Sequence, residues 1–161
     1  MDMDRKDFAL LEALQENASQ RLEDLARLVG LAPSSVHDRL RRLERGGIIK
    51  NWTIKLDAPS LGLGVLAFIG ATTSRPCSEL LESLCAIPAI EECHSVAGER
   101  CLFLKVRSAD TAGLLILIEK LLQIPGIDRT ETTVVLRTQF DRPIPLKTLA
   151  TGKKERQAGS S

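Results

Sequence analysis

The sequence lacks the features that mark membrane-spanning and secreted proteins. Its longest mostly apolar run, residues 61–71, is much shorter than the roughly 20 residues that a membrane-spanning helix needs. The chain starts with Met-Asp-Met-Asp, which is acidic, whereas a secretory signal starts with a basic stretch followed by an apolar one. We therefore expect a cytoplasmic protein.

The sequence is also poor in the residues and motifs of catalytic sites. It has no tyrosine, and its two histidines, His37 and His94, lie in different segments of the chain. It contains no P-loop, no zinc signature, no pair of catalytic carboxylates and no serine–histidine–aspartate order. We therefore expect that the protein is not an enzyme and needs no cofactor.

The four cysteines are evenly spaced but do not form a metal-binding pattern. They stand at positions 77, 85, 93 and 101, eight residues apart, without any C-x-x-C pair. In a reducing compartment such cysteines are free thiols that pack as small apolar side chains. We expect no metal site, and a thiol sensor centred on Cys101 is the alternative interpretation.

Positive charge is concentrated in one part of a nearly neutral chain. Lysine and arginine number 22 against 21 acidic residues, a net charge of +1. Residues 27–55, however, hold seven basic residues and two acidic ones, so this segment alone carries a charge of +5. A local basic block in a neutral protein indicates one contact with a polyanion.

Hydrophobic periodicity predicts three short helices at the start of the chain. The first covers about residues 4–16, the second follows the apolar spacing of residues 22–29, and Pro33 suits the first position of the third. Gly30 supplies the turn between the last two helices, and Ile48–Leu56 predicts a strand or small hairpin. We assign residues 1–56 to one domain with a helix-turn-helix motif at about residues 22–41.

The third helix presents polar side chains once its apolar stripe, Val36, Leu40 and Leu43, points inward. A recognition helix needs short polar groups for base edges in its first turns and arginines where phosphates pass. The predicted base contacts are Ser34, Ser35, His37 and Asp38, and the predicted phosphate contacts are Arg41 and Arg42. The alternative is a three-helix domain whose arginine-rich helix is only a solvated surface.

The rest of the chain contains an internal repeat. Residues 57–64, rich in Gly, Pro and Ser, predict a linker, and residues 65–140 then repeat the order strand, helix, I-P-x-I, strand. Two such units joined by a tight turn at Gly98 and Glu99 give βαββαβ, a ferredoxin-like fold, so the fold class is α+β. Residues 141–161 form a C-terminal extension that we expect to be disordered from about residue 151.

Four stretches of the chain resemble motifs of the Lrp/AsnC family of transcriptional regulators. The resemblance rests on the stretch Val29–Ile49, on the opening D-R-K-D-F-A-L-L, on C-H-S-V-A-G-E-R-C from Cys93, and on I-P-G-I with T-E-T from Ile124. It implies a winged N-terminal domain that binds double-stranded DNA and a C-terminal, RAM-type domain that forms homodimers through its sheet. Dimers of this family assemble further, to tetramers or octamers, and bind small amino acids between them.

The resemblance implies an effector site around the second-domain hairpin, made of Val96, Gly98, Glu99, Cys101, Thr130 and Thr132. Two positions depart from the family pattern. Ala32 replaces the usual serine that caps the recognition helix, and Cys101 replaces an acidic residue facing the pocket. An effector-independent regulator is therefore an alternative, and so is an enzyme similar to siroheme decarboxylases, which share this layout but use clustered His, Arg and Tyr.

Overall fold

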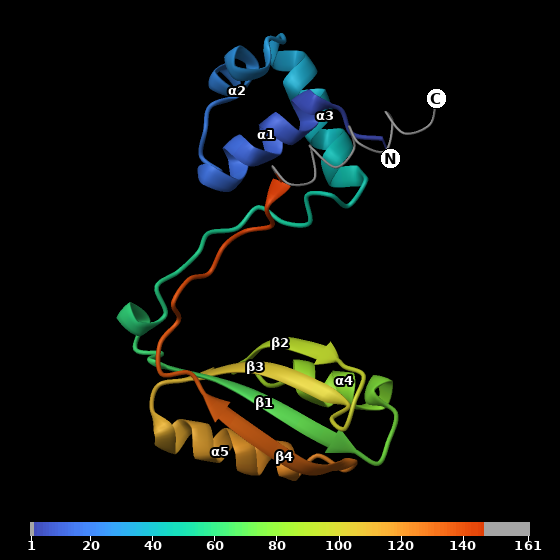
Figure 1. The fold of residues 1–161 in the computed structure, drawn as a ribbon, viewed down its shortest axis with the longest axis vertical. Coiled ribbons are helices and arrows are strands. Elements are labelled where there is room, and N and C mark those ends of the chain that lie inside the picture. Colours follow the sequence, from blue (N-terminus) through green and yellow to red (C-terminus); the bar gives the residue numbers. More distant parts are fainter. Residues whose placement is uncertain (1, 147–161) are drawn as a thin grey trace. The chain divides into compact units, whose positions relative to one another are not determined.

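The computed structural model describes residues 2–146, and the chain divides into two units (Figure 1). Of the described residues, the first unit contains 2–54 and 140–146, and the second contains 55–139. The predicted linker, residues 57–64, belongs to the second unit and contains a short 3-10 helix, η1 (Pro59–Leu61). The segment predicted to be disordered, from about residue 151, lies outside the described residues.

The first unit consists of the three predicted helices, α1 (Arg5–Glu16), α2 (Leu22–Val29) and α3 (Pro33–Arg45). One apolar cluster joins them, because Leu10 of α1, Leu25 of α2 and Val36 of α3 pack together in the interior. The prediction of helices with one apolar stripe each is thus confirmed.

The turn between α2 and α3 depends on a glycine. Gly30 has φ 61° and ψ 51°, the left-handed conformation that side chains other than glycine rarely adopt. It lets the Leu31 N–H donate to the Ala26 carbonyl oxygen at 3.0 Å, which closes the end of α2. Ala32 then precedes α3 and makes no side-chain cap, as its substitution for serine predicted.

The strand predicted over Ile48–Leu56 is wrong for the described chain. Residues 50–56 have no regular secondary structure and form no bridge to another strand. Their apolar side chains stay in solvent, with Trp52 exposed by 49% and Ile54 by 76%. The alternating pattern there is suitable for a strand, but a strand also needs a neighbour to take its backbone hydrogen bonds, and within the described residues this segment has none.

The second unit is a four-stranded antiparallel sheet with two helices, which confirms the ferredoxin-like prediction. Its elements follow in the order β1 (Val65–Thr73), α4 (Cys77–Cys85), β2 (Ile90–Ser95), β3 (Leu102–Ser108), α5 (Thr111–Leu122) and β4 (Ile127–Val134). The strand order across the sheet is β2-β3-β1-β4, so the two halves of the repeat interlock around β1 and β3 (Figure 1).

Both helices cover the same face of this sheet. Leu80 and Leu84 of α4 and Leu114, Leu117 and Leu121 of α5 share one buried cluster with the inward side chains of β1 and β3. The opposite face carries Phe68 and Phe103, whose rings stack with centroids 5.5 Å apart. This open face of the sheet has no covering element among the described residues.

Candidate functional site

Helix α3 presents the predicted set of polar side chains to solvent. Val36 and Leu43 are fully buried and Leu40 is half-buried, so the helix has one inward stripe. The predicted base contacts, Ser34, Ser35, His37 and Asp38, are all exposed, as are the predicted phosphate contacts Arg41 and Arg42. The structure therefore brings the six residues to the accessible surface of one helix.

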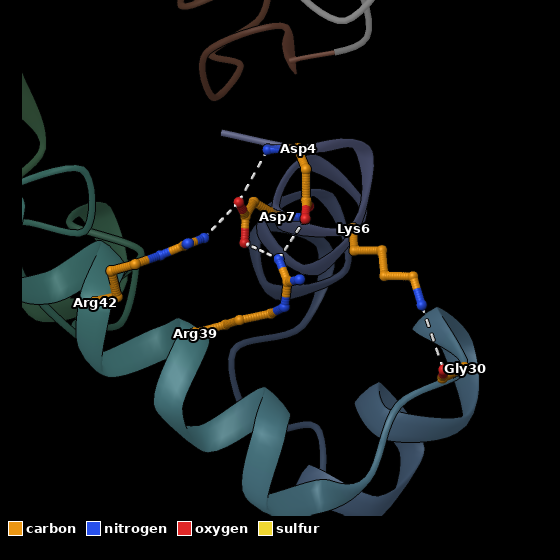
Figure 2. A network of polar contacts seen from close by, with 6 residues as sticks. All are labelled: Asp4, Lys6, Asp7, Gly30, Arg39 and Arg42. Atoms are coloured by element: carbon orange, nitrogen blue, oxygen red, sulfur yellow. Dashed lines mark hydrogen bonds and ion pairs between the residues drawn. The ribbon is translucent and has the colours of Figure 1, made fainter. Parts of the chain in front are cut away.

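The two predicted phosphate contacts differ in their surroundings. Arg41 makes no ion pair within residues 2–146, and neither does Arg45 one turn later. Arg42 instead reaches back to α1, where its Nη2 donates to Asp7 Oδ2 at 2.6 Å (Figure 2). Its side chain is still 47% exposed. The positive charge of Arg42 is thus partly offset within the protein, whereas that of Arg41 faces solvent.

Asp7 is the centre of a polar cluster that sequence reasoning missed. Its side chain has no exposed area, and Oδ1 accepts a hydrogen bond from Nη1 of Arg39 at 2.9 Å. The same Arg39 nitrogen donates to Asp4 Oδ2 at 2.7 Å, and the Asp4 N–H donates to Asp7 Oδ2 at 3.0 Å. Figure 2 shows both arginines of α3 converging on the start of α1. We call these four residues, Asp4, Asp7, Arg39 and Arg42, the α1–α3 clamp.

The pKa of Asp4 reflects this arrangement. The backbone N–H of Asp7, and after it the Arg39 guanidinium, hold the pKa of the Asp4 carboxyl below its usual value.

The position of Asp7 in the sequence does indicate that its carboxylate is buried. Asp7 stands three and four residues before Leu10 and Leu11, so it lies on the apolar stripe of α1, where a carboxylate requires buried partners.

The predicted effector residues of the hairpin lie around its turn. The chain reverses around Gly98 and Glu99 as predicted, and the Val96 N–H donates to the Cys101 carbonyl oxygen at 3.0 Å, but residues 96–101 form a longer loop instead of a tight two-residue turn. Val96, Gly98 and Glu99 line a shallow hollow together with Arg100 and Phe103. Cys101 does not line it, and its N–H is bonded to the Ala71 carbonyl oxygen at 2.9 Å.

Thr130 and Thr132 lie on a different side of the sheet from that hollow. They pair with Ala71 and Ile69, whose side chains are buried beneath the helices. Directly opposed residues of an antiparallel pair project to the same face, so both threonine side chains project towards the helices. Thr130 still borders a second hollow together with Glu99, but Cys101 and Thr132 line neither hollow, so the six predicted effector residues do not all converge on one hollow within a single chain.

A second hollow beside the hairpin is lined mainly by charged side chains of the open face. Its residues are Gly70, Thr72, Glu99, Arg100, Arg129, Thr130 and Glu131. Arg100 pairs with Glu131, and its aliphatic part crosses Gly70, where a Cβ atom would stand 2.3 Å from Arg100 Cδ. Glu99 and Arg129 make no ion pair in the described part of the chain, which leaves one negative and one positive group available.

The cysteines are free thiols, and three of the four are half-buried. Burial in the sheet raises the pKa of the Cys93 thiol, and the neighbouring Cys85 and Cys77 raise it further. A raised pKa lowers the fraction of reactive thiolate. His94 pairs with Glu92 on the open face at 3.1 Å, and His37 belongs to the other unit.

Within the described residues, no helix combines the length and the apolar character that crossing a membrane requires. No group of three or more His, Cys, Asp or Glu side chains in that range is arranged to hold a metal ion.

Comparison with known proteins assigns both units. Residues 3–50 match the winged helix-turn-helix DNA-binding family, and residues 66–145 match the Lrp/AsnC ligand binding domain. The chain is 34% identical over 140 residues to the leucine-responsive regulatory protein of Escherichia coli, covering 84% of this chain and 85% of that protein.

Solved structures agree with the sequence matches. The structure of Escherichia coli AsnC aligns with a TM-score of 0.83 at 30% identity, covering 89% of this chain and 99% of AsnC. A transcriptional regulator of Neisseria meningitidis in complex with L-Met aligns with a TM-score of 0.85 at 26% identity, covering 92% of this chain and 99% of that one. The chain belongs to the Lrp/AsnC family of helix-turn-helix transcriptional regulators.

Proposed function

We propose that this regulator binds double-stranded DNA in a sequence-specific way by inserting α3 into the major groove. The observation that carries this proposal is the exposure of a contiguous polar surface on α3 above a buried stripe formed by Val36 and Leu43. In this arrangement Ser34, Ser35, His37 and Asp38 reach base edges and Arg41 reaches a phosphate, whereas Arg42, which the sequence predicts as a second phosphate contact, is held by Asp7.

The open face of the sheet is our proposed dimer interface. At its centre the stacked rings of Phe68 and Phe103 are half-buried and have no covering element in the described chain. Ion pairs surround them, including Lys105 with Glu92 at 2.8 Å. An apolar centre within a polar rim is the usual organisation of a protein interface, and a second copy presents the same surface by symmetry.

A dimer gives the DNA proposal its geometry. Two copies of α3 enter successive major grooves of a pseudo-palindromic site whose half-sites are about one helical turn, roughly 34–36 Å, apart. Larger assemblies, tetramers or octamers of the same chain, place further pairs of recognition helices on neighbouring sites.

The effector we propose is an amino acid or a similar small zwitterion bound at the hairpin, between neighbouring dimers. The Neisseria relative was solved with L-Met, and the hairpin here offers backbone N–H groups near Gly98 for a carboxylate. With Cys101 in place of an acidic residue, Glu99 is the carboxylate closest in sequence for an ammonium group. Val96 supplies apolar contact, whereas Thr130 and Thr132, whose side chains project towards the helices, are not part of this proposed site.

This function places the protein in the cytoplasm, where DNA and free amino acids meet, and it requires no catalytic step. Relatives from Pyrococcus are named as HTH-type transcriptional regulators. Because His37 and His94 belong to different units, a clustered His site of the siroheme-decarboxylase kind is not part of the proposal.

The experiment that tests the proposal is selection of DNA from a random duplex pool by the full chain, followed by gel-shift assays of the selected site. The assays use two salt concentrations, with and without a mixture of the twenty amino acids. We expect salt-sensitive binding that the mixture alters. Binding that is indifferent to the mixture refutes the amino-acid effector only, whereas failure to enrich any sequence refutes specific DNA binding.

The dimer interface has its own test. Phe103→Asp places a charge at the centre of the open face, and we expect a monomer by sedimentation velocity together with weaker binding to the selected site. Lys120→Asp, on α5 of the opposite face, is the matched control and retains the wild-type mass. A Phe103→Asp protein that remains dimeric rules out this face as the interface.

A further inference from the structure

We propose that Asp7 is a positioning residue for DNA recognition: it fixes the rotation of α3 about its own axis by holding Arg39 and Arg42. Asp7 stands on α1 and its side chain has no exposed area, so its own position does not mark it as part of a DNA interface. The inference rests on the docking of α3 proposed above and adds to it the residue that sets the geometry of that helix.

Helix α3 is held by apolar contacts as well as by Asp7. Its fully buried side chains, Val36 and Leu43, are seven residues apart, and at about 100° per residue they lie within about 20° of one line along the helix. Half-buried Leu40 packs about 40° to one side of that line, so the apolar contacts support one flank of the helix and leave the opposite flank to other contacts. At its N-terminal end α3 also lacks a side-chain cap, because Ala32 offers none.

Arg39 and Arg42 lie on the same side of α3. Relative to Val36, Arg39 lies about 60° and Arg42 about 120° around the helix in the same direction. Both therefore stand on one flank of the buried line, one turn apart, and both bind the same carboxylate. Arg39 reaches Asp7 Oδ1 at 2.9 Å and Arg42 reaches Oδ2 at 2.6 Å (Figure 2). Two contacts on one flank oppose a roll in either direction.

Asp7 itself is held in place by several contacts. Its side chain is completely buried, and Oδ2 also accepts the Asp4 N–H at 3.0 Å. The Asp4 carboxylate accepts the Asp7 N–H in return at 2.9 Å, which makes a capping box at the start of α1. Because Asp7 is bound on both oxygens and through its own backbone, it is a fixed anchor for the more exposed arginines.

The consequence for recognition follows from helix dimensions. Side-chain atoms on the outer surface of a helix lie roughly 5–6 Å from its axis, so a roll of about 20° moves them by about 2 Å. Hydrogen bonds to base edges tolerate a range of only about 0.5 Å in donor–acceptor distance. A roll of this size removes base contacts by Ser34 or Asp38, while phosphate contacts by long arginine side chains survive it.

The test compares specific and non-specific binding by the full chain. The probes are the duplex that the wild type selects from a random pool and a scrambled duplex of the same length. For Asp7→Asn we expect the ratio of the two affinities to fall at least tenfold. Affinity for the scrambled duplex stays equal or rises, because the variant loses a negative charge and releases Arg42.

A purely structural role gives a different result. Unfolding of part of the sample lowers both affinities by the same factor and leaves their ratio unchanged. Leu25→Val, in the core of the same unit, is the control for stability, compared at an equal fraction of folded protein. A ratio for Asp7→Asn within twofold of the wild-type value overturns the inference.

A second variant covers the case in which Asp7→Asn does not fold. Arg42→Lys keeps the positive charge at a half-exposed position but loses the planar guanidinium that reaches Asp7. We expect the same fall in the affinity ratio, and an unchanged ratio in this folded variant also overturns the inference. A wild-type protein that selects no sequence refutes the docking proposal instead, so the two failures are distinguishable.

Discussion

Arg41→Ala and Arg42→Ala, two separate variants at neighbouring positions of α3, test different roles. Arg41 is a proposed DNA contact, and Arg42 makes a contact inside the protein. Arg41 is exposed and makes no ion pair within residues 2–146, so Arg41→Ala changes the free energy of unfolding by no more than about 0.5 kcal/mol. In the proposed dimer it removes two of the proposed phosphate contacts. The slope of log K against log[salt] then becomes shallower by about 1.8, since each phosphate contributes about 0.9.

The salt effect is large enough to measure directly. A slope difference of about 1.8 means that, between 50 and 200 mM salt, the wild-type protein loses roughly 12-fold more affinity than Arg41→Ala does. Arg137→Ala, on an exposed arginine of the second unit, removes the same charge away from α3 and serves as the matched control. We expect it to leave the slope unchanged.

Arg42→Ala has the opposite signature. It removes one of two guanidinium partners from the buried Asp7 carboxylate, and a hydrogen bond to a charged group contributes about 1.5–3 kcal/mol. Because Arg42 is 47% exposed, solvent screening reduces this to about 1–2 kcal/mol, a fall in Tm of roughly 5 °C or more. Thermal unfolding followed by circular dichroism measures it. An Arg42→Ala protein with unchanged Tm and a shallower salt slope refutes the pairing with Asp7.

Three further variants test other parts of the structure. Ala32→Ser adds the missing cap of α3 and raises stability by about 1 kcal/mol in thermal unfolding. Gly70→Ala displaces the Arg100 side chain, so a double-mutant cycle of Gly70→Ala with Arg100→Ala gives a combined loss of Tm smaller than the sum. Glu92 pairs with Lys105, which lowers the pKa of Glu92 and raises that of Lys105. The pair therefore stabilises the fold above the usual glutamate pKa and below the usual lysine pKa, and urea titrations of Glu92→Gln find a cost at pH 7 that is lost as the pH falls through the lowered pKa of Glu92.

Local patterns in the sequence predicted most of the fold. The helices of both units follow apolar spacing within segments of eight to thirteen residues, and the repeated I-P-x-I follows α4 and α5. Pairing of Val96 with Cys101 follows from the reversal of the chain between them. These features depend on neighbours in the sequence, so a single sequence contains the information that specifies them.

The features that sequence reasoning missed depend on residues far apart in the chain. Asp7 meets its partners Arg39 and Arg42, 32 and 35 positions later, and no local pattern states which arginines a buried carboxylate will bind. The family motif groups Thr130 and Thr132 with the hairpin, but the register in which β4 pairs with β1 directs their side chains towards the helices. The expected strand at Ile48–Leu56 failed for the same reason, because strand formation requires a partner that the segment itself does not specify.

The α1–α3 clamp also changes how the basic segment contributes to affinity. Counted from the sequence, residues 27–55 carry +5, but Arg39 and Arg42 already bind Asp4 and Asp7. On α3 this leaves Arg41 and Arg45 as the arginines without an ion pair in residues 2–146. Two such cations per chain give a proposed dimer about four phosphate contacts from α3, and a salt slope of about −3.6.

A dependence of this size has a consequence for regulation. With few electrostatic contacts per chain, one protomer binds any DNA weakly, and occupancy of a site depends on how many recognition helices the assembly presents at the correct spacing. Under the proposed function, the effector between dimers acts on DNA binding by changing the assembly, without touching α3. The prediction is that a monomeric Phe103→Asp protein retains wild-type contacts per chain, with about half the salt slope of the dimer. A monomer with the full slope contradicts the count of two free arginines on each recognition helix.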